Sequence, residues 1–156
     1  MKIEPRNSKA QPQSVELSLQ KPGKYESNPE QTFDIIINVL NRQGRWIVIQ
    51  SPIKGSEEHR VTFRLWTFEE MIEIKRKATT VDPMSRKTNI DFDLMNRMKV
   101  QKLLTSWTFS NDNPRLSIQH VNGVMTDESW KAFTKLDPSI IQRILDEMNF
   151  FLDCGG

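Results

Sequence analysis

A change of hydrophobic period at one point constrains this chain more than any other feature. Val61, Phe63 and Leu65 alternate with polar side chains, which is the period of a β-strand with one buried face. Two residues later the pattern becomes helical, because Thr67 and Glu70 have the spacing of a capping box at a helix start. Glutamates then precede lysines and arginines, the order that the helix dipole favours. The sequence therefore predicts a strand that runs directly into a helix.

Two further strands are predicted before this junction. Apolar side chains recur at every second position from Phe33 to Val39, which favours a strand, although Ile36 and Leu40 also permit a short helix. The β-branched residues tilt the prediction to a strand, and residues 46–50 form a second β-branched run. The segments Asn41 to Gly44 and Pro52 to Ser56 contain the turn residues that would reverse the chain. We expect the three strands to form a small antiparallel β-meander.

The chain after the junction is predicted to be mainly helical. We expect a solvent-exposed, charged loop around Pro83. Residues 108–125 are expected to be irregular, and the turn residues Asn111 to Pro114 within them allow a hairpin. Capping residues and apolar stripes predict three more helices: one from Asp91 or Asp93 to about Trp107, a short one capped by Thr126, and a last one capped by Asp137 with Pro138 in its first position.

These elements predict the α+β class: a small antiparallel β-meander followed by four helices, helix-rich, with an extended N-terminal arm. The arm is residues 1–31, which contain four prolines and few apolar side chains, so that alone they cannot bury enough surface to offset their ordering entropy. Residues 32–156 are expected to form a single α+β domain, since a chain of 156 residues is the size of one domain.

Composition disfavours several classes of function. The 22 basic and 20 acidic side chains leave a net charge of +2, so no global field attracts nucleic acid or anionic lipid. No stretch approaches the ~20 apolar residues that span a bilayer, and a soluble cytoplasmic product is expected. A single cysteine, Cys154, allows no intramolecular disulfide and no cysteine cluster for zinc.

No catalytic residue, metal site or cofactor is predicted. His59 and His120 are the two histidines, and both are interpreted as ordinary loop or structural residues rather than bases that activate a nucleophile. Residues 82–93 have the length of a calcium loop, but Met84 and Arg86 stand at ligand positions and Lys87 replaces the turn glycine. With six glycines and no phosphate-binding glycine motif, we expect a protein that is not an enzyme.

The last helix is the strongest candidate for binding a protein partner. Large apolar residues recur at spacings of three and four residues along this helix. Phe150 beside Phe151 widens this apolar stripe beyond what a small domain must bury. The helix can instead simply close the core, or do both, with Ile140, Ile144 and Met148 inward. The predicted partner-binding residues are Ile141, Leu145, Met148, Phe150, Phe151 and Leu152.

A basic face of the sheet is the alternative binding site. Basic strands with an aromatic side chain can hold single-stranded nucleic acid through phosphate contacts and base stacking. Here the candidates are Arg45, Trp46, Arg60 and Arg64. The opposing interpretation is that the tryptophans fit core or staple positions and that the helical cations complement the helix dipole and the glutamates before them.

Residues 60–152 resemble the small tail assembly proteins of long-tailed bacteriophages. The shared features are W-T-F-E-E opening a helix, K-R-K-A-T ending it, V-D-P-M-S-R-K-T closing on I-D-F-D, then T-D-E-S-W and L-D-P-S-I-I-Q-R-I-L-D-E-M-N. The resemblance is to tail assembly chaperones and equally to baseplate hub assembly proteins. It implies a non-catalytic protein of the host cytoplasm or the virion tail. Its partners would be tail tube, tape-measure or baseplate subunits, within an oligomer or larger assembly.

Overall fold

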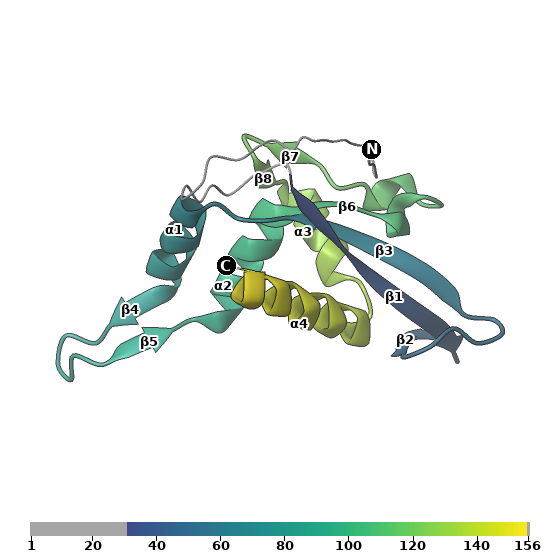
Figure 1. Cartoon of the computed structure of the whole chain (residues 1–156), viewed down its shortest axis with the longest axis horizontal. Helices are drawn as coiled ribbons and strands as arrows, with labels where there is room; N and C mark the ends of the chain where they lie inside the picture. Colours follow the sequence, from purple (N-terminus) through teal and green to yellow (C-terminus); the bar gives the residue numbers. More distant parts are fainter. Residues whose placement is uncertain (1–30, 156) are drawn as a thin grey trace, which may run out of the picture.

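The fold is described from a computed structural model, which covers residues 31–155 (Figure 1). Its α+β class is the one that the sequence predicts: antiparallel strands with four α-helices. The strands are β1 (Thr32–Arg42), β2 (Arg45–Ile49), β3 (Glu57–Arg64), β4 (Thr79–Val81), β5 (Thr88–Ile90), β6 (Leu104–Trp107), β7 (His120–Val121) and β8 (Val124–Met125). The helices are α1 (Phe68–Ala78), α2 (Phe92–Leu103), α3 (Asp127–Thr134) and α4 (Pro138–Gly155), with 3₁₀ turns at Thr108–Ser110 and Pro114–Leu116.

The main sheet is antiparallel and has the strand order β2-β1-β3-β6, so β1 and β3 are its two inner strands. β3 pairs with β1 rather than with its chain neighbour β2, which is the one way in which the strand order differs from a simple meander. The β1–β2 turn is formed by Gln43 and Gly44, which both have positive φ. This conformation matches the right-handed twist of a two-residue hairpin.

The predicted junction between β3 and α1 is confirmed. Thr67 Oγ1 accepts the backbone N–H of Glu70, and the Glu70 carboxylate accepts the backbone N–H of Thr67. Arg64, the last residue of β3, adds two hydrogen bonds to the same carboxylate. The capping box therefore sets where the helix begins, and the ion pair sets how the strand enters it.

The helix predicted to reach Trp107 ends at Leu103, and residues 104–107 form β6 instead. β6 covers the second edge of β3, whose backbone groups would otherwise have no strand neighbour on that side. The Thr105 hydroxyl also donates to the Thr62 carbonyl at 3.0 Å. Pairing to β3 thus outweighs the local helical pattern at these four residues.

Two more expectations between the helices are wrong in detail. The loop expected around Pro83 is a β4–β5 hairpin that projects from the body (Figure 1), and Asp82 closes its turn by accepting from the Met84 N–H and the Ser85 hydroxyl. The segment from Asn111 to Pro114 makes no hairpin but connects the 3₁₀ turns, while the hairpin of this region is β7–β8, further along the chain.

Helix α4 crosses one face of the main sheet, from β2 to α2 (Figure 1). At its start, the Asp137 carboxylate accepts the backbone N–H of Trp46, and the Ser139 hydroxyl donates to the Trp46 carbonyl. Near its end, Asn149 accepts from Lys99 of α2. The carboxylate that was predicted to cap α4 is therefore bonded to β2, and α4 covers the outer edge of that strand.

The buried apolar residues form a single cluster to which the sheet and all four helices contribute. Of the arm predicted over 1–31, residues 1–30 lie outside the described part of the chain. Within residues 31–155, no helix combines the length and apolar character that crossing a membrane requires.

Candidate protein-binding surface

The inner side of α4 is built from residues four apart, which lie on one face of a helix. Ile140, Ile144, Met148 and Leu152 are all buried in the core. Met148 is 0% exposed and Leu152 is 2% exposed, so neither can contact a partner in this fold. Their inclusion among the predicted partner-binding residues is corrected: the stripe that they continue closes the core.

The end of α4 carries the apolar surface that the core leaves uncovered. Phe150 is 63% exposed and Phe151 is 36% exposed, and their rings meet edge to face at 6.1 Å between centroids. Phe151 stacks on Phe33 of β1 at 4.5 Å, and Phe33 stacks in turn on the fully buried Phe63 at 5.7 Å. We call Phe33, Phe150 and Phe151 the aromatic surface; it continues the core outward to solvent.

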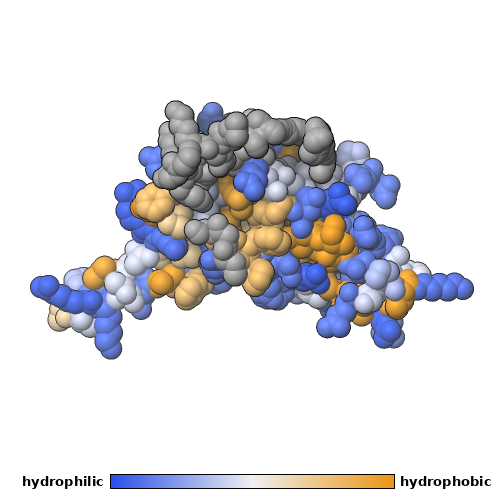
Figure 2. Space-filling view, viewed as in Figure 1, coloured by the Kyte–Doolittle hydropathy of each residue, from blue (hydrophilic) through white to orange (hydrophobic). Residues whose placement is uncertain are grey.

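The other two predicted residues of α4 are intermediate in exposure between the buried Met148 and the exposed Phe150. Ile141 and Leu145 are partly buried and pack against the core, so only part of each side chain is open to a partner. Figure 2 shows apolar side chains grouped in the middle of the face that α4 crosses, with more polar parts projecting at both ends.

A strand edge lies beside the aromatic surface. β3 pairs with β1 from Thr32 to Val39, but β2 pairs with β1 only from Asn38 to Arg42. Within the described chain, the first part of β1 thus has a strand neighbour on one side only. Arg143 of α4 donates to the Ile36 carbonyl at 3.2 Å, so this carbonyl already has a hydrogen-bond donor within the chain. Aromatic side chains next to such an edge are suited to holding an extended apolar segment.

Sequence reasoning missed Phe33 and Arg143 as parts of this surface. The period of β1 places Phe33 on the same side as the buried Ile35 and Ile37, but at the start of the strand, where cover is incomplete. That position is a usable signal for a half-exposed aromatic residue. The contact of Arg143 with β1 depends on where α4 docks, which no local pattern specifies.

The alternative basic face does not come together as predicted. Arg64 is bound by Glu70, and its guanidinium is largely covered. Trp46 is partly buried against the core and so does not offer a free ring for base stacking. Arg45 lies 3.3 Å from an Asp137 oxygen, and Arg60 lies 3.8 Å from an Asp34 oxygen. Each cation thus has a carboxylate neighbour, which weakens the attraction of this face for phosphate.

The two histidines are placed differently from each other. His59 lies in β3 rather than in a turn; its ring stacks on Phe109 at 4.2 Å, and its Nδ1 is 2.9 Å from Thr108 Oγ1. Its other nitrogen is 3.2 Å from the exposed Glu57 carboxylate. His120 is exposed in β7. Neither residue lines the cavities described next.

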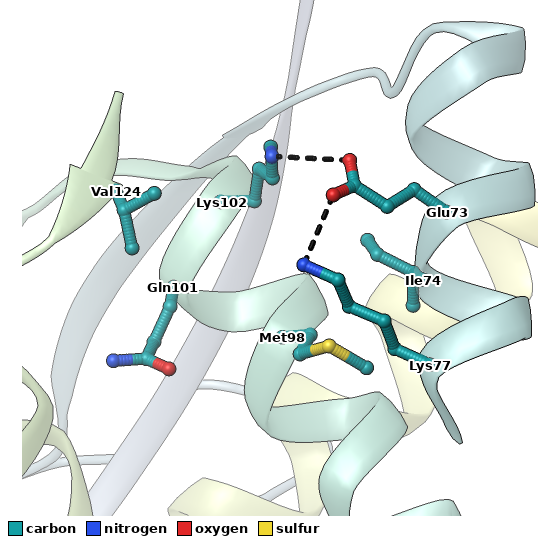
Figure 3. A pocket seen from close by; sticks show the side chains of 7 residues that line it. All are labelled: Glu73, Ile74, Lys77, Met98, Gln101, Lys102 and Val124. Atoms are coloured by element: carbon teal, nitrogen blue, oxygen red, sulfur yellow. Dashed lines mark ion pairs between the residues drawn. The ribbon is translucent and has the colours of Figure 1, made fainter. Parts of the chain in front are cut away.

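A small cavity of about 160 Å³ lies between α1, α2 and β8 (Figure 3). The Glu73 carboxylate lies between two ammonium groups, 3.0 Å from Lys77 Nζ and 3.8 Å from Lys102 Nζ. The hydrogen bond from Lys77, helped by the charge of Lys102, lowers the pKa of Glu73. The Glu73 carboxylate is thus shared by both ammonium groups, and these three groups together carry one positive charge in excess.

A larger cavity of about 440 Å³ lies on the other side of α2 and contains the one buried lysine of the described chain, Lys99. Sequence reasoning missed Lys99, although its position four residues after Met95 places it on the buried stripe of α2. Desolvation by burial is the main cause that lowers the pKa of this ammonium. It is the described chain's clearest example of a charge held away from water.

Comparison with known proteins adds no family to this description, since no family model, curated protein or solved structure matches the chain.

Proposed function

We propose that this chain is a non-catalytic assembly protein that binds other proteins through the aromatic surface. The observation that carries the proposal is the ring stack from buried Phe63 through Phe33 and Phe151, beside the exposed Phe150. Aromatic side chains held rigidly at a surface lose little entropy on binding and often dominate the binding energy of an interface.

The resemblance of residues 60–152 directs the proposal to bacteriophage tails. On this proposal the partner is a tail tube, tape-measure or baseplate subunit, which presents an extended apolar segment to the edge of β1 next to the aromatic surface. Binding would take place in the host cytoplasm during assembly, and the complex could remain in the virion tail.

The test is direct binding to recombinant tail tube, tape-measure and baseplate subunits encoded near this gene. Phe150→Ser should weaken binding to its partner by about tenfold or more. Phe68→Ser is the matched control, because Phe68 is 62% exposed and Phe150 is 63% exposed, yet Phe68 lies at the start of α1. Equal loss in both variants, or no binding to any of the three classes, would overturn the proposal.

A second measurement separates protein binding from the basic-face alternative. Single-stranded oligonucleotide should bind weakly, and Arg60→Ala should not change that binding. Salt-dependent oligonucleotide binding that Arg60→Ala removes would favour the nucleic-acid function instead.

A further inference from the structure

Lys99 is a buried cation whose direct contacts are neutral, while the Asp153 carboxylate acts on it from further away. The side chain is 5% exposed; its Nζ donates to Asn149 Oδ1 at 2.7 Å and lies 5.2 Å from the centre of the Trp66 ring. Among residues 31–155, no carboxylate oxygen lies within 4.0 Å of this nitrogen. An amide oxygen and an aromatic face replace only part of the hydration that an ammonium loses on burial.

The cavity next to Lys99 has the size and lining of a small-molecule site. Its volume of about 440 Å³ falls within the range of ~300–1,000 Å³ that is typical of ligand pockets. Its lining combines apolar side chains with polar and charged groups that converge from α1, α2 and α4, as in sites that orient a ligand. The lining residues are Lys75, Thr79, Ile90, Phe92, Met95, Asn96, Lys99, Asn149 and Asp153.

The charges of this lining favour an anion. Lys75 and Lys99 are cationic and Asp153 is anionic, which leaves one positive charge in excess. Asn149 also donates from its Nδ2 to Asn96 Oδ1 at 3.1 Å, so its oxygen is held towards Lys99. The exposed rings and chains of Phe92 and Ile90 lie at the same cavity and offer an apolar wall.

We propose that this cavity binds a small ligand that has a carboxylate on an apolar body, with the carboxylate at Lys99 and the body against Phe92 and Ile90. The ligand supplies a carboxylate in direct contact with Lys99, where the described protein has only the more distant Asp153. A charge-assisted hydrogen bond from a buried ammonium is roughly twice as strong as a bond between neutral groups. The ligand would also link α2 to the end of α4, since the cavity is lined by both helices.

The probes are phenylacetate and its uncharged analogue phenylacetamide, titrated into the full chain by calorimetry and by amide chemical shifts. Phenylacetate should bind about tenfold or more tightly than phenylacetamide, with the largest shifts at Asn96, Lys99 and Asn149. Equal affinities would show that no anion is recognised. Shifts confined to other parts of the fold would place the probe elsewhere, and either result overturns the proposal.

Three variants test the role of Lys99. Lys99→Met should weaken phenylacetate binding by about tenfold or more, while Lys102→Met, on the same helix but paired with Glu73 outside this cavity, should leave it unchanged. Asn149→Asp keeps an oxygen next to Lys99 but adds the missing negative charge, so it should abolish binding and raise the midpoint of thermal unfolding. Asn149→Asp keeps the test valid if Lys99→Met does not fold.

A purely structural role for Lys99, in which it only ties α2 to α4, gives different results. Asn149→Asp would then raise stability, but phenylacetate would not bind to the unaltered chain. A last experiment distinguishes two sources of the carboxylate, a peptide C-terminus and a small acid. The probe is acetyl-Ala-Ala-Phe with a free C-terminus. It binds more tightly than phenylacetate if the ligand is a peptide C-terminus, and less tightly if the ligand is a small acid. If neither the peptide nor the acid binds, the proposed function of the aromatic surface still stands, because the cavity and the aromatic surface share no residue.

Discussion

The Arg64 guanidinium holds the Glu70 carboxylate with two hydrogen bonds, of 2.9 and 2.6 Å, at the point where β3 becomes α1. The same carboxylate accepts the Thr67 backbone N–H at 2.9 Å. One side chain thus caps the helix and anchors the strand before it. Glu70→Gln keeps an oxygen for Thr67 but removes the charge, and we expect it to lower the free energy of unfolding by about 1 kcal/mol. Thr67→Ala, which removes the other half of the box, should cost a similar ~1 kcal/mol in urea unfolding.

The same pair makes stability depend on pH in acid. The hydrogen bonds from Arg64 lower the pKa of Glu70, so the native state binds a proton to this carboxyl less readily than the unfolded chain does. The stabilisation is present above the unfolded pKa and is lost as pH falls through the folded pKa. Urea titrations below about pH 5 should show a smaller loss for Glu70→Gln than for the unaltered protein. Parallel acid curves for the two proteins would contradict this.

Lys99 should make stability depend on pH at the alkaline end. Burial lowers the pKa of this ammonium below its ordinary value, so between the folded and unfolded pKa values the unfolded chain binds more protons. Stability therefore rises with pH across that window. Relative to Lys99→Met, the unaltered protein should gain stability as pH rises from the folded pKa of Lys99 to about pH 10. A constant difference between the two proteins over that range would be inconsistent with a desolvated ammonium.

The attachment of β2 to α4 should depend on Asp137. Its carboxylate accepts the Trp46 backbone N–H and lies 3.3 Å from Arg45 Nε. Asp137→Ala removes both contacts and should cost about 1–2 kcal/mol, with faster hydrogen exchange of the Trp46 amide. Asp137→Asn keeps an acceptor for Trp46 and serves as the control, for which most of the amide protection should remain.

The turn between β1 and β2 offers a stabilising change. Gln43 has φ of 54° and Gly44 has φ of 83°, a left-handed pair that suits Asn-Gly best. Gln43→Asn should raise the free energy of unfolding by about 0.5 kcal/mol, whereas Gly44→Ala should lower it by about 1 kcal/mol. The loss at Gly44 would be conformational, because an added Cβ meets no atom within 4 Å. Thermal unfolding of the two variants measures both changes in stability.

Elements whose causes are local were predictable from residues alone. The helix starts at Thr67, Asp91 and Thr126 depend on side chains that bond the backbone three residues on, and each of them is observed. The antiparallel strands before α1 follow from alternation. Residues 104–107 were misassigned, because a sequence that continues the pattern of α2 is drawn into the sheet by the free side of β3.

The candidate surface was predictable only in part. Phe150 and Phe151 stand out as surplus apolar residues of α4, but Met148 and Leu152 differ from them only in which side of the helix meets the sheet. That choice is made by docking: Asp137 and Ser139 fix one end of α4 on Trp46, and Arg143 fixes its middle on Ile36.

By itself, the sequence determined the α+β class, the local starts of three helices and the positions of the main strands, since those depend on contacts within a few residues. Only the tertiary structure decided that β1 and β3 are the inner strands, that β6 joins the sheet, and that Phe33 stacks against Phe151. It also decided that the cation of Lys99 lies in a cavity wall where its hydrogen-bond acceptor is the neutral amide of Asn149. The physical reason is that these contacts join residues far apart in the chain, and their energies arise only when whole elements pack.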